Sequence, residues 1–127
     1  MKTYRDLEVW NESMQLVEDV YRLTEDFPKD ERFGLRSQMQ RAAVSIPANV
    51  AEGYGRSGRT DYARFVAIAR GSLMELETYL ALSVRLELTN RTAMLPIWNR
   101  AESVGEMLTR LRTVLARPQT PSPRPQS

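Results

Sequence analysis

Cysteine and histidine are both absent from this chain of 127 residues. Without cysteine the chain can form no disulfide, thiolate zinc site or cysteine nucleophile, and an intracellular origin is the default expectation. Without histidine it lacks the commonest general base, the commonest transition-metal ligand and the usual physiological pH switch. Both absences count against catalysis and against a bound metal.

Long apolar runs are missing as well. No run approaches the roughly 18 to 20 residues that a membrane helix needs. The opening stretch, MKTYRDLEVW, contains no apolar segment of the kind found in secretory signals. We therefore expect neither a membrane segment nor a secretory signal, and the length of 127 residues favours a single domain.

Charge is present but unevenly distributed around a formal net charge of +2. Residues 1–32 hold nine acids against five bases, whereas residues 33–70 hold six arginines against two acids, Glu52 and Asp61. A chain with one acidic and one basic third can pair with itself in an oligomer, or can offer its basic part to a polyanion.

Helical periodicity fills the chain between breaks at residues 27–30, 53–60 and 88–90. Apolar residues recur at spacings of three and four, which indicates amphipathic helices and not strands. The pattern predicts helices near 5–26, 31–55, 60–87 and 92–116, with Pro96 in the first turn of the last helix. Short connections between such helices favour an all-α, antiparallel up-down four-helix bundle over residues 1–117.

The end of the chain, PQTPSPRPQS at 118–127, has four prolines and almost no apolar side chain. We expect this tail to be disordered or extended, because it cannot bury enough surface to offset the entropy of ordering.

The first predicted helix carries two apolar rows, which is more than one seam of a monomer needs. The extra row indicates either deeper burial within the bundle or a subunit interface. One row holds Val9, Leu16, Val20, Leu23 and Phe27, and beside it runs a row of Leu7, Trp10, Met14, Val17, Tyr21 and Thr24.

Residues 40–56, QRAAVSIPANVAEGYGR, combine helix-forming residues with a proline. On a helical wheel of about 100° per residue, the apolar residues of 35–56 share one sector, which favours a helix that continues through Pro47. Such a proline costs about 3 kcal/mol, and we expect it to kink this second helix of the bundle. The alternative is a break at which Ser45 caps a new short helix over residues 46–55.

A polar sector of the same segment includes Ser45, Asn49, Glu52 and Arg56. Glu52 and Arg56 are four residues apart, so an ion pair on the helix surface is expected. Asn49 and Ser45 can either satisfy the carbonyl freed by Pro47 or bond to another helix, and buried polar groups of this kind usually fix the register of packing.

Signals for catalysis are weak. A hydrolytic pair of Glu52 and Glu75 across two helices is conceivable, but nothing in their spacing requires it. The GYGRSG run at 53–58 lacks the strand–loop–helix context of a dinucleotide site, and a helix stop followed by a turn explains it. A di-iron bundle site needs Glu-x-x-His pairs, which a chain without histidine cannot supply. We predict no catalytic residue, no metal and no cofactor.

Two stretches, SQMQRAAVSIPANVAEGYGR at 37–56 and DYARFVAIARGSLMELETYL at 61–80, closely resemble a four-helix-bundle family first noticed in intervening sequences of bacterial 23S rRNA genes. The resemblance extends over about residues 4–115 and includes LEVW and DFPKDERFGLRSQ. It implies a cytoplasmic bacterial protein that assembles into a ring-like homopentamer. It also implies a relationship to the accessory variability protein of diversity-generating retroelements, a basic pentamer that binds nucleic acid and the reverse transcriptase.

The residues that match the family motifs suggest packing roles. Gly71 and Ser72, inside the third predicted helix, favour the close approach of another backbone, because glycine costs about 1 kcal/mol in a helix interior relative to alanine. The structural-motif residues carried by the resemblance are Ser45, Pro47, Asn49, Glu52, Gly53, Gly71 and Ser72.

Nucleic-acid binding is the leading functional hypothesis. Arginines surround the expected turn between the second and third helices, and two tyrosines flank it and could stack on bases. Phosphate contacts of this kind are largely independent of sequence and sensitive to salt. The alternative is a protein-interaction scaffold that binds no nucleic acid, which the two apolar rows and the acidic first third favour. The candidate nucleic-acid-binding residues are Arg41, Arg56, Arg59, Arg64, Arg70, Tyr54 and Tyr62.

Overall fold

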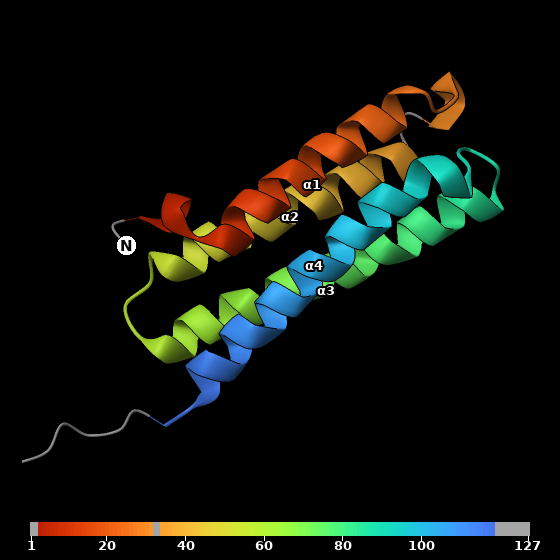
Figure 1. Ribbon diagram of the computed structural model, residues 1–127. Helices are drawn as coiled ribbons and strands as arrows, with labels where there is room; N and C mark the ends of the chain where they lie inside the picture. The colour runs from red at the N-terminus through yellow and green to blue at the C-terminus, as the bar shows by residue number, and fades with distance from the viewer. Residues whose placement is uncertain (1–2, 32–33, 119–127) are drawn as a thin grey trace, which may run out of the picture.

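The structure is a computed structural model that describes residues 3–31 and 34–118. These residues form four α-helices, which run alternately up and down and pack as a bundle, with α1 lying against α4 to close it (Figure 1). The predicted all-α, up-down four-helix bundle is therefore confirmed. In chain order the elements are the 3-10 turn η1 (Tyr4–Asp6), α1 (Glu8–Glu25), the 3-10 turn η2 (Lys29–Glu31), α2 (Leu35–Tyr54), α3 (Arg59–Arg85) and α4 (Arg91–Ala116).

Local chemistry sets where the helices begin. Thr3 accepts a hydrogen bond from the backbone N–H of Arg5 and so caps η1, a separate turn that the predicted helix over 5–26 had included. Gly34, with a non-helical φ of −100° and ψ of −119°, precedes α2, which begins at Leu35 and not near residue 31. Asn90 caps α4 by accepting the backbone N–H of Ala93 at 2.9 Å.

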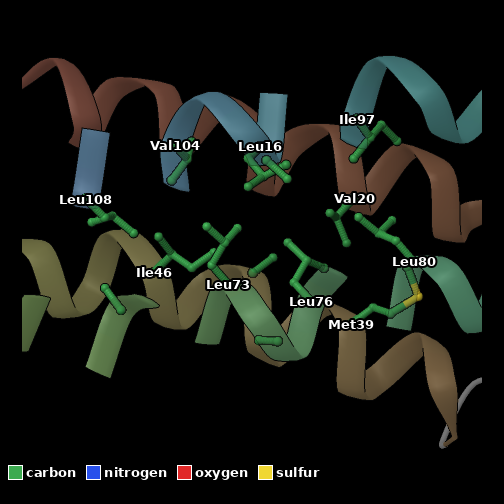
Figure 2. Close-up of a cluster of buried hydrophobic side chains, with 14 of the residues drawn as sticks. Leu16, Val20, Met39, Ile46, Leu73, Leu76, Leu80, Ile97, Val104 and Leu108 are labelled. Atoms are coloured by element: carbon green, nitrogen blue, oxygen red, sulfur yellow. The ribbon is translucent and has the colours of Figure 1, made fainter. Parts of the chain in front are cut away.

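The core follows the predicted apolar stripes. Each of the four helices contributes side chains that point into the middle of the bundle (Figure 2). Burying one Leu, Ile or Val side chain is worth about 1.5–3 kcal/mol relative to leaving it exposed, so this core is the main stabilising term. The labelled core residues are Leu16, Val20, Met39, Ile46, Leu73, Leu76, Leu80, Ile97, Val104 and Leu108.

The two apolar rows of α1 have different surroundings. The row that starts at Val9 enters the core, with Leu16 and Val20 fully buried. In the other row Thr24 is buried, but Met14 and Tyr21 stay 41% and 43% exposed. Leu7, Trp10 and Val17 of this second row pack partly buried against the core, so deeper burial explains much of both rows, and Met14 and Tyr21 leave apolar surface on the outside of the bundle.

Helix α2 runs unbroken through Pro47, so the predicted continuous helix is confirmed and the break at Ser45 is not found. The side chain of Asn49 donates to the carbonyl of Ser45 at 2.7 Å and to its hydroxyl at 2.9 Å. The carbonyl that Pro47 deprives of its helical donor belongs to Ala43, so Asn49 does not compensate for the proline. The hydroxyl of Ser45 instead bonds to that of Ser72 on α3 at 2.8 Å, which links the two helices.

Two sequence-based expectations are wrong in detail. Gly71 is exposed, and a Cβ added there would meet nothing within 4 Å, so no backbone approaches it closely. Pro96 is the sixth residue of α4, because that helix begins at Arg91, and it therefore lies beyond the first turn. Its missing N–H costs the helix the bond to the carbonyl of Thr92.

The predicted boundary between the bundle and the tail, at residue 117, lies next to the end of α4. Helix α4 ends at Ala116, and Pro118 is the last described residue, so the rest of the predicted tail at 118–127 lies outside the described residues. Within residues 3–31 and 34–118, no helix is both long and apolar enough to cross a membrane.

Candidate nucleic-acid interface

The turn between α2 and α3 positions the candidate arginines. Gly58, with a φ of +104° that favours glycine, immediately precedes α3. Gly53, one turn earlier, is buried, and a Cβ added there would lie 2.8 Å from the Cβ of Phe65 and 3.1 Å from the ring of Tyr62. Glycine at this position lets α2 and α3 approach closely, which is the packing role predicted for the motif.

Arg56 and Arg64 flank the ring of Phe65. The guanidinium carbons lie 5.1 Å and 4.6 Å from the ring centroid, within the range of a cation–π interaction. Arg56 also forms the predicted ion pair with Glu52, and Arg64 lies 3.5 Å from a carboxylate oxygen of Asp61. Both side chains stay about half exposed, so they can exchange these weak surface pairs for a phosphate group.

Arg59 has a structural bond that sequence reasoning did not foresee. Its guanidinium donates to the carbonyl of Val114, near the end of α4. The last carbonyls of a helix lack helical donors and carry partial negative charge, so a cation is stabilising there. Arg59 thereby fastens the start of α3 to the end of α4.

The antiparallel topology brings further arginines to the same end of the bundle. Arg112 lies four residues before the end of α4 and Arg117 directly after it, and both are exposed. Arg117 lines a shallow hollow with Gly58, Arg59 and Leu115. Spacing along the chain gave no sign of this, because α4 is separated from the α2–α3 turn by the whole of α3. We call this region, with Arg56, Arg59, Arg64, Arg112 and Arg117, the arginine-rich end.

Two of the predicted arginines lie elsewhere. Arg41 is 15 residues before Arg56 on α2, and Arg70 is 11 residues after Arg59 on α3. At a rise of about 1.5 Å per residue, these separations correspond to roughly 22 Å and 16 Å along the helices. Arg41 therefore cannot share one phosphate with the arginine-rich end, whereas Arg70 lies only six residues, or about 9 Å along α3, from Arg64.

The two candidate tyrosines pack on each other. The rings of Tyr54 and Tyr62 meet edge to face, with centroids 6.1 Å apart and planes at 86°. Both are partly buried, and burial, with a smaller contribution from Tyr54, raises the pKa of the Tyr62 hydroxyl above its ordinary value. The pair closes the α2–α3 end of the core, so its first role is packing.

Carboxylates do not assemble into a reactive pair at this site. Glu52 lies two residues before the end of α2, whereas Glu75 lies 16 residues after the start of α3. The two positions are therefore about 20 Å apart along the bundle, too far for a hydrolytic pair. Among residues 3–31 and 34–118, no three acidic side chains are grouped so that they could hold a metal ion.

Comparisons with known proteins agree with the fold. A family model described as 23S rRNA-intervening sequence protein matches residues 5–110. A crystal structure of a protein with unknown function from the S23 ribosomal protein family of Bacteroides thetaiotaomicron superposes with a TM-score of 0.74 at 23% identity. The match covers 82% of this chain and 97% of that chain. None of the curated proteins matches this chain.

Proposed function

The chain belongs to the 23S rRNA-intervening sequence protein family, and from this premise we propose that it is a non-catalytic, homo-oligomeric protein that binds RNA or DNA through its arginine-rich end. The observation that carries the proposal is the gathering of Arg56, Arg59 and Arg64 with Arg117, directly after α4, at one end of the bundle. The resemblance supports a ring of five copies and a cytoplasmic location.

Physical chemistry favours a binding mode without base specificity. Arg56 and Arg64 lie on the surface, and each is held over Phe65, so both present charge without a large loss of side-chain entropy. Contacts of arginine with phosphates release counterions from the nucleic acid, so the affinity falls steeply as salt rises. A ring that repeats the arginine-rich end gains avidity because several copies contact one strand.

The test is the binding of labelled single-stranded RNA and duplex DNA, followed by fluorescence anisotropy over a series of salt concentrations. We expect the double variant Arg56→Ala with Arg64→Ala to bind more weakly. The slope of log affinity against log salt should fall by about 1 for each arginine that no longer neutralises a phosphate. The matched control is Arg22→Ala with Arg36→Ala, which removes the same charge near the other end of the bundle. No binding by the wild-type protein at low salt, or equal weakening in both double variants, would exclude this site.

A protein-interaction scaffold is the second candidate function. It is favoured by a specific observation, since Arg56 and Arg64 already have acidic partners while Met14, Tyr21 and Val44 leave apolar side chains exposed. The anisotropy experiment separates the two functions, because a scaffold does not bind the labelled strands at any salt concentration.

A further inference from the structure

Two grooves lie on opposite sides of the bundle. One, the α1–α2 groove, is lined by Tyr21, Gln40, Arg41 and Val44 among others, with Val44 42% exposed. The other, the α3–α4 groove, is lined by residues of α3 and α4. Among the described residues each helix packs against its two neighbours and not against its diagonal partner, so the α1–α2 side faces away from the α3–α4 side (Figure 1).

The α3–α4 groove is built around Trp98. Leu82 of α3 and Leu95 of α4 flank the indole ring, and Leu95 is 50% exposed. Glu77 lines the groove on the side away from the connection between the helices, whereas Arg85 lies toward that connection. The floor is apolar, and acidic and basic groups lie at its ends.

The grooves lie at the same height along the bundle. Arg41 is six residues after the start of α2 and Trp98 is seven residues after the start of α4. Both therefore lie about 10 Å from the end that holds the α1–α2 and α3–α4 connections. Glu77, eight residues before the end of α3, lies about 12 Å from the same end. A second copy standing in the same direction can bring one groove against the other without sliding along the axis.

Opposite charges lie at similar heights in the two grooves, Arg41 in one and Glu77 in the other, whereas Arg85 and Arg91 line the α3–α4 groove closer to the connection between its helices. Arg41 is exposed and makes no hydrogen bond or ion pair within the part of the chain that the structure describes. Burial first, and then the nearby carboxylate of Glu102, raises the pKa of Glu77 above its ordinary value. Glu102 itself accepts a hydrogen bond from the indole N–H of Trp98 at 2.9 Å, which holds it at the groove.

We propose that the α1–α2 groove of one copy docks on the α3–α4 groove of the next, with Tyr21 and Val44 against Trp98 and with Arg41 beside Glu77 and Glu102. This inference rests on the proposed self-assembly and specifies its contact surface. Because the two surfaces differ, the contact is heterologous and each copy contacts two neighbours. Since the grooves lie on opposite sides of the bundle, the contact closes a ring only where each copy is also rotated relative to the one before it. Charge complementarity selects this pairing over groove-to-identical-groove contact, where Arg41 would face Arg41 or Glu77 would face Glu77.

The test reverses one charge in each groove. Assembly is measured by light scattering coupled to size-exclusion chromatography over a range of concentrations. We expect Arg41→Glu and Glu77→Arg each to raise the concentration at which half of the chains assemble by at least about tenfold, because each places like charges together in a partly desolvated contact. The double variant should recover most of the assembly. Arg110→Glu, an exposed arginine on α4 that neither groove includes, is the control and should assemble like the wild type.

Mixing the two single variants gives a second measurement. Each variant keeps one native groove. The native α1–α2 groove of the Glu77→Arg chain fits the native α3–α4 groove of the Arg41→Glu chain. The mixture should therefore assemble at concentrations at which neither variant assembles alone. Circular dichroism melting curves verify that each variant is folded. A monomeric wild-type protein overturns the self-assembly together with this inference. A wild-type oligomer that neither charge reversal weakens overturns the groove pairing alone.

Discussion

Gly53 and Gly71 both lie in helices, but their surroundings are opposite. A Cβ at position 53 would lie 2.8 Å from the Cβ of Phe65, whereas one at position 71 would meet nothing within 4 Å. We expect Gly53→Ala to lower the free energy of unfolding by about 1–3 kcal/mol, because the added methyl group would overlap Phe65 and the packed helices α2 and α3 cannot easily move apart. Gly71→Ala should raise it by about 0.5–1 kcal/mol, because alanine loses less backbone entropy on folding.

Urea unfolding followed by circular dichroism checks this pair of substitutions. The protein concentration must be fixed, since assembly adds to the apparent stability. Each substitution is the control for the other, because both add one methyl group to a helical glycine. Equal destabilisation by the two would contradict the open surroundings of Gly71.

Residue identity alone did not separate these two glycines. The motif resemblance assigned both a packing role, since glycine in a helix interior costs stability and invites a structural explanation. Only the relative rotation of α2 and α3 about their axes determines which glycine faces a neighbour. That rotation is set by the whole core, so it is not contained in the local sequence.

At the scale of elements, the two helix-interior prolines differ in burial. Pro96 is exposed and Pro47 is buried. We expect Pro96→Ala to raise the free energy of unfolding by about 1–3 kcal/mol, because the substitution restores the backbone bond to Thr92 and removes no packed surface. Pro47→Ala should gain less, since the loss of about two buried methylene groups, at about 0.8 kcal/mol each, offsets the restored bond to Ala43.

Thermal unfolding of the two proline variants, compared with the wild type under the same buffer, measures this difference. A larger gain from Pro47→Ala than from Pro96→Ala would show that the strain at Pro47 outweighs its packing. The prediction is that Pro96→Ala raises the free energy of unfolding more than Pro47→Ala does, and it depends less on the absolute size of either change.

Helix existence and helix ends were predictable to different degrees. The spacing of apolar residues predicts one face of α3 that holds Tyr62, Phe65, Val66, Ala69, Leu73, Leu76 and Leu80. The last five are buried, whereas Tyr62 and Phe65 at the start of the helix are only partly buried. The start of α2 was predicted near residue 31 and lies at Leu35, because Gly34 and the 3-10 turn η2 interrupt the segment without disturbing its apolar periodicity. Periodicity reports which face is buried, and caps decide where a helix begins.

The candidate site could be predicted only where it is local in sequence. Arg56, Arg59 and Arg64 lie within nine positions of one another, so their gathering at one turn follows from the chain itself. Arg112 and Arg117 join them through the antiparallel return of α4, and the bond from Arg59 to Val114 spans 55 positions. Topology, and not spacing, adds those residues to the arginine-rich end.

At the scale of the molecule, Arg100 closes the bundle by joining its last helix to its first. Its guanidinium donates to Asp19 at 2.8 Å and to Glu12 at 3.0 Å, and it also bonds to Gln15. We expect Arg100→Met to lower the free energy of unfolding by about 1–2 kcal/mol, between the values for surface and buried ion pairs, because its side chain is 31% exposed.

Arg22→Met is the matched control for this prediction. Arg22 also pairs with Asp19, at 3.6 Å, but its side chain is 71% exposed and the pair stays within α1. Its removal should cost less than about 0.5 kcal/mol. Hydrogen exchange should also rise along α1 and α4 in Arg100→Met alone. Equal effects of the two substitutions would mean that the α1–α4 contact does not depend on Arg100.

The up-down topology places the beginning and the end of the described chain, Thr3 and Pro118, at the same end of the bundle as the α2–α3 turn (Figure 1). An affinity tag or fluorophore joined next to Thr3 or Pro118 therefore sits beside the arginine-rich end and competes with whatever approaches it. A label in the connection around Thr89, between α3 and α4, reports from the opposite end and leaves those arginines uncovered.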